Sequence, residues 1–384
     1  MKQIKSSLIP IKTLPTGDSL SIKTFKLKGD QEGPQVYIQA NVHGAEIQGN
    51  AVIYELLNFF INHKFIGELI FVPCANPMGL NNKAGTFTQG RFNPVTGDNW
   101  NRNYTDLLTL PKEKINFDLS SFAKKFRESS LDTIKKEFKA ELEKAYTAYW
   151  DNICQEKGPN ENNFLNITLQ KLASTSDIVI DLHTGPKATR YLYAAEFEKE
   201  SAKNFLTPFF LVIPNKFAGA MDEACFMPWL HLEAALKDLG REVSLGFESY
   251  TLELGSEETI SSKEAKADAA RIIHYLNTMG LNIENPPQID QPEQNFCLLK
   301  NLKTYYSPYA GLVEYLKTPG STFKKGEPLA KVLNFREVNE SKDMEKAWKN
   351  IFALDSGYII THSTTGVIHE GHEIFQVMTN SENP

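Results

Sequence analysis

The sequence predicts an α/β protein with a small β-rich region at its C-terminal end, and three observations support this prediction. Short apolar stretches typical of buried strands alternate with helical periodicity through the larger N-terminal part of the chain. A proline-rich segment, Glu284–Pro292, then interrupts this pattern, and short strand-like stretches with glycine turns follow it. We therefore expect one domain over residues 1–290 and a small β-barrel or sandwich over residues 291–384.

The N-terminal part opens with strand signals. Apolar residues alternate over residues 21–28, and a second strand is expected over residues 35–39. Residues 48–60 are typical of a largely buried helix, and residues 69–73 of a short strand buried in a parallel or mixed sheet. This order favours a sheet flanked by helices.

Two segments depart from the alternation. Residues 76–104 are rich in Asn, Gly, Thr and Pro, and a loop of this length in a compact domain is usually functional or disordered. Over residues 118–152, Lys and Glu alternate with Phe, Leu and Tyr at helical spacing. We expect a pair of surface helices there, within an insertion over about residues 105–165.

Strand and helix signals alternate again after the insertion. Strands are expected over residues 178–182, 209–213 and 242–247, and a helix over residues 228–239. Ser261 followed by Glu264 is typical of a capping box that opens a further helix ending near Leu276.

The C-terminal part contains a faint internal repeat. Gly311, Gly320, Gly326 and Val332 recur as Gly357, Gly366, Gly371 and Val377, at offsets of 45 or 46 residues. Two similar strand-turn-strand halves favour a small β-barrel or sandwich.

Composition excludes several classes of protein. The net charge is -6 and no basic stripe is visible, so nucleic acid is not an expected partner. No apolar run approaches the roughly 18 residues of a membrane span, and the N-terminus lacks the apolar stretch of a secretory signal. Four cysteines without a CxxC pair favour reduced thiols, so we expect a cytoplasmic protein with no membrane partner. The oligomeric state is left open.

Two histidines follow predicted strands. His43 and Glu46 lie between the strand over 35–39 and the next helix, and His183 follows the strand over 178–182. Ligand sites of open α/β sheets lie beyond the carboxyl ends of strands, and imidazole with carboxylate suits Zn²⁺. Three protein ligands with one open position form the pattern of a catalytic zinc site. Each residue alone fits an ordinary capping or loop role equally well.

Further acidic groups accompany these histidines. Asp181 is either a carboxylate at the edge of the core or a hydrogen-bond partner of a metal ligand. Glu253 lies in an otherwise apolar, strand-like stretch and is a candidate general base, because burial tunes the pKa of a carboxyl group. The alternative is an outward-facing strand residue, and Glu248 competes for the same role.

The long polar loop carries two arginines, Arg91 and Arg102, the second of them directly after Asn101. Arginine binds carboxylates through two parallel hydrogen bonds and keeps its charge at any accessible pH. The alternative is that both arginines pair in solvent with loop residues such as Asp98 and Asp106.

In chain order these segments resemble the succinylglutamate desuccinylase/aspartoacylase family, part of the wider zinc carboxypeptidase-like group. The motifs are His-Gly-x-Glu, Asn-Pro-x-Gly, Arg-Phe-Asn-Pro, Asn-Arg, Asp-Leu-His-Thr-Gly and Thr-x-Glu-x-Gly. The resemblance covers about residues 35–280 without the insertion, and residues 311–326 are similar to the family's small β-domain. It implies a zinc-carboxypeptidase-like mixed sheet flanked by helices, with a small C-terminal β-domain.

Carried over position by position, the resemblance implies roles for seven residues. His43, Glu46 and His183 would bind one zinc ion per chain. Glu253 would act as the base on the attacking water, Arg91 would stabilise the oxyanion, and Asn101 with Arg102 would hold a substrate carboxylate. The family usually has Asp-Leu-Asn-Arg where this chain has Asn99-Trp100-Asn101-Arg102, so Trp100 is expected to reshape the substrate pocket.

The function that the resemblance implies is a zinc-dependent hydrolase, a deacylase that cleaves the amide bond of an N-acylated amino acid or a related small amine. The expected partner is a small molecule with a carboxylate. A metallocarboxypeptidase acting on peptides is the alternative among enzymes, and a non-catalytic ligand-binding protein is the alternative of another class. Glu253 favours an enzyme, because a protein that only binds a ligand needs no base.

Overall fold

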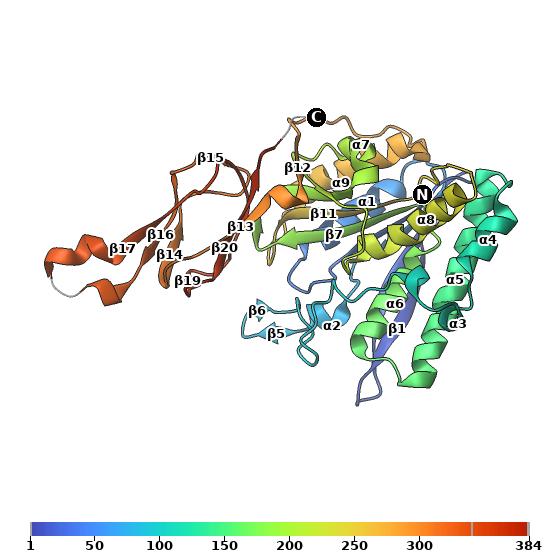
Figure 1. Ribbon diagram of the computed structural model, residues 1–384, viewed down its shortest axis with the longest axis horizontal. Helices are drawn as coiled ribbons and strands as arrows, with labels where there is room; N and C mark the ends of the chain where they lie inside the picture. Colours follow the sequence, from blue (N-terminus) through green and yellow to red (C-terminus); the bar gives the residue numbers. More distant parts are fainter. Residues whose placement is uncertain (1, 339–340, 382–384) are drawn as a thin grey trace. The chain divides into compact units, whose positions relative to one another are not determined.

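The computed structural model describes residues 2–338 and 341–381 and consists of two compact units. Unit 1 comprises Met1–His183, Asn215–Thr251 and Ile260–Ile289, and unit 2 comprises Thr184–Pro214, Leu252–Thr259 and Asp290–Pro384. Figure 1 shows the ribbon of the chain with its helices and strands labelled. The division into domains at residue 290 stays a prediction.

Unit 1 is built on a mixed sheet with the strand order β1-β2-β4-β3-β7-β11. The strands are β1 (Lys5–Thr13), β2 (Ser19–Lys28), β3 (Gln35–Ala40), β4 (Glu68–Val72), β7 (Ile178–Gly185) and β11 (Glu248–Ser256). β2 is antiparallel to β1 and β4, whereas β3 is parallel to both β4 and β7. Every residue of β7 is buried, which explains its continuous apolar sequence.

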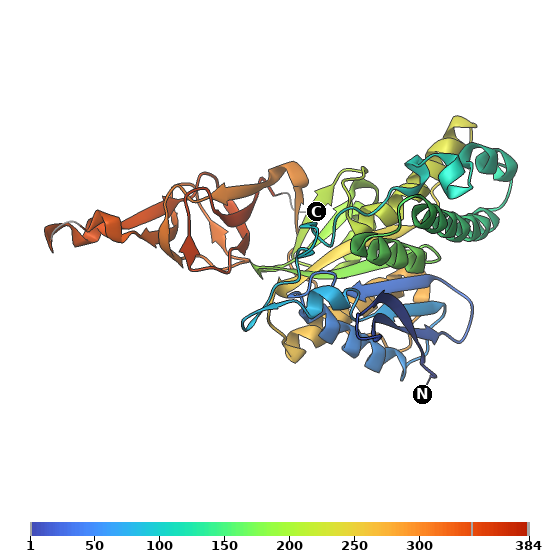
Figure 2. The same cartoon turned by 90° about the horizontal axis from the view of Figure 1, so that it is seen from below.

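Helices cover both faces of this sheet. They are α1 (Gln48–Phe60), α2 (Pro77–Leu80), α3 (Lys112–Ile115), α4 (Leu119–Phe126), α5 (Leu131–Glu156), α6 (Glu161–Ala173), α8 (Met221–Asp238) and α9 (Ser262–Leu276), with short turns η1 (Leu107–Thr109) and η4 (Asn277–Leu281). In Figure 2, α1 and α9 lie together on one side of the sheet, and α5 and α6 lie on the other. The sheet core is therefore closed on both faces.

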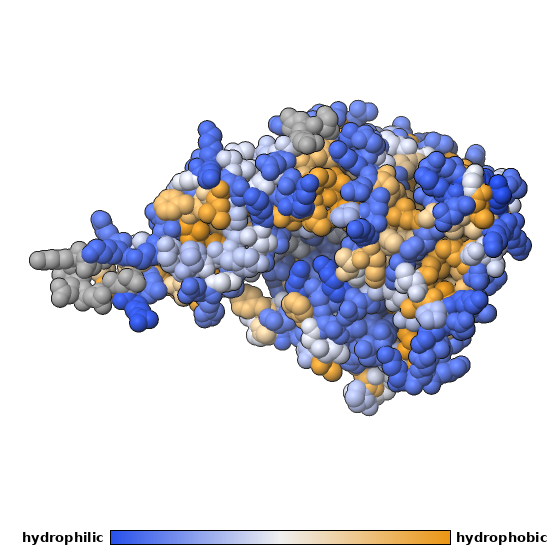
Figure 3. All heavy atoms as spheres, in the orientation of Figure 1, coloured by the Kyte–Doolittle hydropathy of each residue, from blue (hydrophilic) through white to orange (hydrophobic). Residues whose placement is uncertain are grey.

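The sequence-based elements of unit 1 are largely confirmed. The helix expected over residues 48–60 is α1, and Ser261 caps α9 by accepting a hydrogen bond from the backbone N–H of Glu264. The pair of helices expected over residues 118–152 is α4 and α5. Hydrophilic residues predominate on the face of unit 1 around β1, α5 and α6 (Figure 3), as expected for surface helices.

Two expectations for unit 1, one strand and the start of one helix, were wrong. Residues 242–247 form no strand, because the backbone N–H of Leu245 donates to the Glu233 carboxylate of α8 (2.6 Å) instead of to a neighbouring strand. The helix expected from Pro228 begins at Met221, so Pro228 lies inside it. The Glu223 carboxylate stabilises the start of the helix at Met221, because it accepts hydrogen bonds from the backbone N–H groups of Ala218 and Ala220.

Unit 2 contains the C-terminal β region. Strands β9 (Arg190–Ala195), β10 (Phe209–Ile213) and β12 (Asn295–Leu298) pair in parallel. Short helical elements are η2 (Glu196–Glu198), α7 (Lys199–Ala202), η3 (Lys203–Phe205), η5 (Leu299–Asn301), η6 (Phe335–Glu337) and η7 (Ser341–Ala347). The remaining strands are β8 (Lys187–Ala188), β13 (Leu302–Tyr306), β14 (Gly311–Tyr315), β15 (Thr322–Phe323), β16 (Pro328–Leu333), β17 (Trp348–Phe352), β18 (Gly357–His362), β19 (Val367–Ile368) and β20 (Glu373–Thr379).

The internal repeat corresponds to equivalent structural positions. Gly311 opens β14 and Gly357 opens β18. Gly326 and Gly371 precede β16 and β20 with φ angles of 84° and 81°, a conformation that favours glycine. The two halves contribute to the sheets β17-β16-β14-β19 and β13-β20-β18-β15, which enclose a common apolar core. The predicted α/β fold with a small C-terminal β region is confirmed.

Two further observations concern the chain as a whole. Within residues 2–338 and 341–381, no helix is both long and apolar enough to cross a membrane. The four cysteines, Cys74, Cys154, Cys225 and Cys297, are all free thiols.

Candidate metal centre

Two parallel neighbouring strands bring the candidate ligands together. His43 and Glu46 lie in the turn between β3 and α1, and His183 lies on β7, which pairs with β3. The sequence placed His183 just beyond its strand, but β7 continues to Gly185, so the histidine is part of the strand. Asp181 is two residues earlier and therefore faces the same side of the sheet.

The turn that carries His43 depends on unusual backbone geometry. Asn41 has a φ of 67°, and its side-chain Nδ2 donates to the carbonyl oxygens of His43 (2.9 Å) and Gly44 (3.1 Å). A Cβ on Gly44 would lie 2.2 Å from the carbonyl oxygen of Gly79, so only glycine fits. The turn thus holds the His43 imidazole in one place.

The three side chains converge on one point. His43 Nδ1 lies 2.7 Å from Glu46 Oε1, and His183 Nδ1 lies 2.8 Å from Glu46 Oε2. All three side chains are buried, and one ligand atom from each lies within 4.8 Å of the others. The structure therefore brings together the three residues that the sequence singled out.

The outer nitrogens of both imidazoles contact acceptors. His43 Nε2 lies 2.8 Å from Asn99 Oδ1, which also accepts from the backbone N–H of Asn101 (2.9 Å) and is therefore an oxygen. His183 Nε2 lies 2.8 Å from Asp181 Oδ2, a carboxylate oxygen. These acceptors place a proton on each Nε2, and each Nδ1 faces the Glu46 carboxylate.

This donor set fits a divalent metal ion. Two imidazole Nδ1 atoms and one carboxylate face one another in a buried space, so one bound cation would contact all three groups. Two nitrogens with one oxygen is a ligand set that Zn²⁺ accepts, and hydrogen bonds from the distal imidazole nitrogen to carboxylate or carbonyl oxygens accompany metal-binding histidines.

The pKa values of the three clustered side chains are shifted from their ordinary values. Burial alone would raise the pKa of Glu46, but the neighbouring imidazoles of His43 and His183 hold it well below its ordinary value. Burial lowers the pKa of His43. Burial also opposes the charged form of His183, yet the carboxylates of Asp181 and Glu46 raise its pKa well above the ordinary value. The surroundings thus favour the ionised form of Glu46 and the charged form of His183.

The predicted polar residues of the long loop lie beside this cluster. Arg91 is half exposed, and its Nη1 donates to Glu46 Oε1 at 3.0 Å. Asn101 is buried, with its Nδ2 3.4 Å from His183 Nε2. Arg102 is exposed and donates from Nη1 to the carbonyl oxygen of Asn101 (2.6 Å). Arg91 and Asn101 therefore contact metal-ligand candidates directly, whereas Arg102 reaches them through Asn101.

Only 1 % of the surface of Trp100 is exposed, so its indole is part of the core of unit 1. An effect of Trp100 on the substrate pocket stays a prediction. Its neighbours Asn99 and Asn101 instead turn toward the two histidines. The sequence analysis missed the contact between Asn99 and His43. The one signal for it was that Asn99 stands where the family usually has Asp.

The acidic candidates of β11 have different surroundings. Glu253 lies in the part of β11 that belongs to unit 2 and is partly buried. Glu248 lies at the start of the strand in unit 1, where its Oε2 accepts hydrogen bonds from the hydroxyls of Tyr250 (2.8 Å) and Tyr275. Glu248 is therefore engaged in a structural contact.

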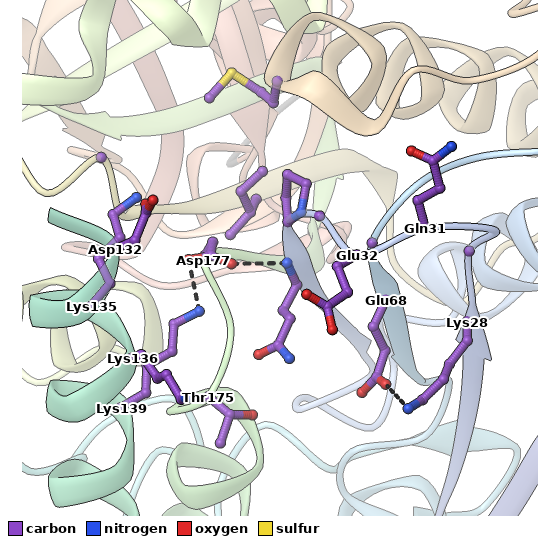
Figure 4. Close-up of a pocket in the computed structure, with 18 of the residues that line it drawn as sticks. Lys28, Gln31, Glu32, Glu68, Asp132, Lys135, Lys136, Lys139, Thr175 and Asp177 are labelled. Atoms are coloured by element: carbon purple, nitrogen blue, oxygen red, sulfur yellow. Dashed lines mark hydrogen bonds and ion pairs between the residues drawn. The ribbon is translucent and has the colours of Figure 1, made fainter. Parts of the chain in front are cut away.

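A large groove of about 1310 Å³ lies elsewhere in unit 1. Figure 4 shows Lys135, Lys136 and Lys139 of α5 on one wall, Glu32 and Glu68 on the other, and the Lys139–Asp177 ion pair (2.7 Å) between them. Its lining includes the first residues of β3, β4 and β7. It therefore opens at the amino ends of the parallel strands, whereas the His–Glu–His cluster lies toward their carboxyl ends, where ligands of α/β sheets bind.

The fold and this cluster define a class of α/β proteins that hold a candidate metal centre at the carboxyl ends of a mixed sheet. Residues 32–151 match the family model of the succinylglutamate desuccinylase/aspartoacylase catalytic domain. A structure from Shewanella frigidimarina, named for this family, is 35% identical over 100% of this chain and 99% of its own, with a TM-score of 0.91. The chain belongs to the succinylglutamate desuccinylase/aspartoacylase family, a family of deacylases.

Two further solved structures and one negative result complete the comparison. A family protein from Shewanella amazonensis is 36% identical, covering 99% of this chain and 100% of its own, with a TM-score of 0.90. The ectoine utilization protein EutE from Ruegeria pomeroyi, in a product-bound structure, is 16% identical, covering 99% of this chain and 96% of its own, with a TM-score of 0.63. The likeness to EutE shows a shared fold and nothing more. No curated protein matched the chain.

Proposed function

We propose that this chain is a zinc-dependent hydrolase that cleaves the amide bond of an N-acylated amino acid or a related small amine. The observation that carries the proposal is the convergence of His43 Nδ1 and His183 Nδ1 on the Glu46 carboxylate, with both Nε2 atoms held by acceptors. Membership of a deacylase family gives this centre its reaction class.

His43, Glu46 and His183 would hold one Zn²⁺ per chain. When bound, Zn²⁺ would polarise the attacked carbonyl and lower the pKa of a water ligand to about 7. Three protein ligands leave a coordination position open, as catalytic sites require.

The chain's own residues would carry the remaining steps. Glu253 would take a proton from the attacking water as its oxygen bonds to the carbonyl carbon, and would then pass that proton to the amine nitrogen as the C–N bond breaks. The products are a carboxylate and a free amine. The proposal for Glu253 rests on the family motif in which it lies.

Arg91 and the Asn101–Arg102 pair would bind the anionic parts of the substrate. The guanidinium of Arg91, 3.0 Å from Glu46, would stabilise the negative charge that develops on the carbonyl oxygen. Asn101 and Arg102 would hold a carboxylate of the substrate, and Arg102 keeps an exposed guanidinium for this purpose. Four free cysteines support a cytoplasmic location.

Two experiments test the proposal. Metal analysis of the purified chain should find about one zinc per chain, and a chain that binds no zinc would contradict it. A screen of N-acetyl, N-succinyl and N-formyl amino acids alongside short peptides should show hydrolysis of an acylated amino acid. Hydrolysis of peptides alone would indicate the metallocarboxypeptidase, and zinc binding without any turnover would indicate the non-catalytic ligand-binding protein.

A further inference from the structure

Helix α6 buries three amide side chains on one face. Asn162, Asn166 and Gln170 are spaced four residues apart, so they form a row along the helix. All three are buried. A buried amide is unfavourable unless it is hydrogen-bonded, so a row of three on one helix face requires a polar partner.

The partner is the segment 93–105 of the long loop. Asn162 Oδ1 accepts from Asn93 Nδ2 (2.6 Å), and Asn166 Nδ2 donates to the carbonyl oxygen of Arg102 (2.9 Å). Gln170 accepts from the backbone N–H of Thr105 (3.1 Å) and donates to its carbonyl oxygen (2.8 Å). We call Asn162, Asn166 and Gln170 the amide row of α6.

The segment held in this way carries the groups that surround the metal centre. Asn99 contacts His43, Asn101 contacts His183, and Arg102 donates to the carbonyl of Asn101. Apart from one isolated β-bridge between Phe92 and Asn99, residues 93–105 form no helix or strand. Turn hydrogen bonds and the bond from the Tyr104 N–H to the Gly219 carbonyl hold parts of the segment, and the side chains of α6 support it at Asn93, Arg102 and Thr105.

We propose that the amide row of α6 positions segment 93–105, so that Asn99 meets His43 and Arg102 is oriented for a substrate carboxylate. The inference rests on the proposed function for the role of Arg102, but the support of the segment is a separate physical claim. In this proposal α6, at the end of the helical insertion, supports the loop that borders the candidate metal centre. Asn162, Asn166 and Gln170 are positioning residues, since they touch the loop rather than the ligands.

Hydrogen exchange of the full-length protein tests the support directly. Asn166→Ala and Gln170→Ala should speed exchange at the backbone amides of Trp100 and Asn101, which do not contact the row themselves, by about fivefold or more, the change expected from one lost hydrogen bond. Thr168→Ala is the matched control, because Thr168 lies on the same helix between the two positions and makes no side-chain hydrogen bond to the described part of the loop. Faster exchange confined to Thr105 would overturn the proposal.

Kinetics separates positioning from a general loss of structure. In Asn166→Ala, KM for an acylated amino acid should rise about fivefold or more, while the zinc content at saturating metal stays at the wild-type level because the three ligands are untouched. An unchanged KM would overturn the proposal. If the alanine variants fail to fold, Gln170→Met keeps the size of the side chain without a buried charge and loses both hydrogen bonds to Thr105, and it should show the same changes.

The two proposals fail in different ways. A wild-type protein that hydrolyses no acylated amino acid contradicts the proposed function, whereas the exchange measurement needs no turnover and still decides whether the amide row holds the loop. Wild-type exchange at Trp100 and Asn101 in Gln170→Met and in both alanine variants would overturn the inference even in an active deacylase.

Discussion

The backbone of Gly44 lies directly against that of Gly90. The Gly44 N–H donates to the Gly90 carbonyl oxygen at 2.8 Å, and a Cβ on Gly90 would lie 2.6 Å from the Gly44 Cα atom. This contact joins the turn that carries His43 to the loop that carries Arg91. The position of Arg91 relative to the candidate metal ligands therefore depends on two residues without side chains.

Gly44→Ala should lower both stability and activity. The new Cβ would lie 2.2 Å from the Gly79 carbonyl oxygen, a backbone atom that cannot move alone. Overpacking of this kind costs about 1–3 kcal/mol, which thermal unfolding will measure. Gly366→Ala is the control, because a Cβ there meets nothing within 4 Å and the backbone has no positive φ. Equal stability of the two variants would contradict the close contact.

His183→Ala should lose most of its bound zinc. His183 would supply one of three ligands, and its Asp181 partner would be left in a buried place without it. Atomic absorption on purified protein is the measurement. His63→Ala removes a histidine that stacks on Phe59 instead and should keep its metal. Wild-type zinc content in His183→Ala would show that the ligands are misassigned.

Asn99→Leu should weaken zinc binding by about 10–100-fold, the usual effect of removing a hydrogen-bond partner of a ligating histidine. The variant loses the oxygen that accepts from His43 Nε2. Asn99→Asp keeps an acceptor in the same place and should retain tight binding. Competition with a chromophoric chelator gives both affinities, and equal affinities for the wild type and Asn99→Leu would contradict the role of Asn99.

Glu253→Gln should lower kcat by about 10²–10⁴-fold, because an amide cannot accept the proton of the attacking water. Bound zinc should not change, since Glu253 is not among the proposed ligands. Glu248→Gln is the control, because it retains an oxygen for the hydroxyls of Tyr250 and Tyr275 and should stay active. An active Glu253→Gln enzyme would show that another group is the base.

Asp222 should make stability depend on pH. Burial, together with the nearby Glu223 charge, raises its pKa from 3.8 to about 7. The unfolded chain releases this proton near pH 4 and the folded chain only near pH 7, so the free energy of unfolding falls as the pH rises between these values. At about 1.4 kcal/mol per pH unit, the loss from this group reaches about 4 kcal/mol above pH 7.

Asp222→Asn removes this titration and keeps an oxygen that accepts from the Glu223 N–H. In chelator-treated protein, the variant should therefore be more stable than the wild type at pH 8 and lose that advantage near pH 4. Urea unfolding at the two pH values measures the difference. Asp238→Asn, at an exposed position of the same helix, is the control for the loss of a carboxylate from α8. A pH-independent effect of Asp222→Asn would contradict the raised pKa.

The sequence predicted those features that local patterns determine. Apolar runs and caps located α1, β7 and α9, and motif order singled out His43, Glu46 and His183. Features that depend on contacts distant in sequence were missed. The Asn99–His43 hydrogen bond joins residues of separate segments, and the amide row of α6 looks like ordinary polar spacing until the loop is placed against it. Residues 242–247 resemble a strand in sequence, but they form none, and the Leu245 N–H donates to a helix side chain.

The ligands of the candidate centre come from positions far apart along the chain. His43 follows β3, and His183 lies on β7 beyond the whole run of helices α1 to α6. A metal ion bound there would act as a reversible cross-link, closing a long loop that the unfolded chain leaves open. At a hundredfold excess of free metal over Kd, such a link adds about 2.7 kcal/mol to the free energy of unfolding. The melting temperature would then report metal occupancy in a sample for which no substrate is at hand.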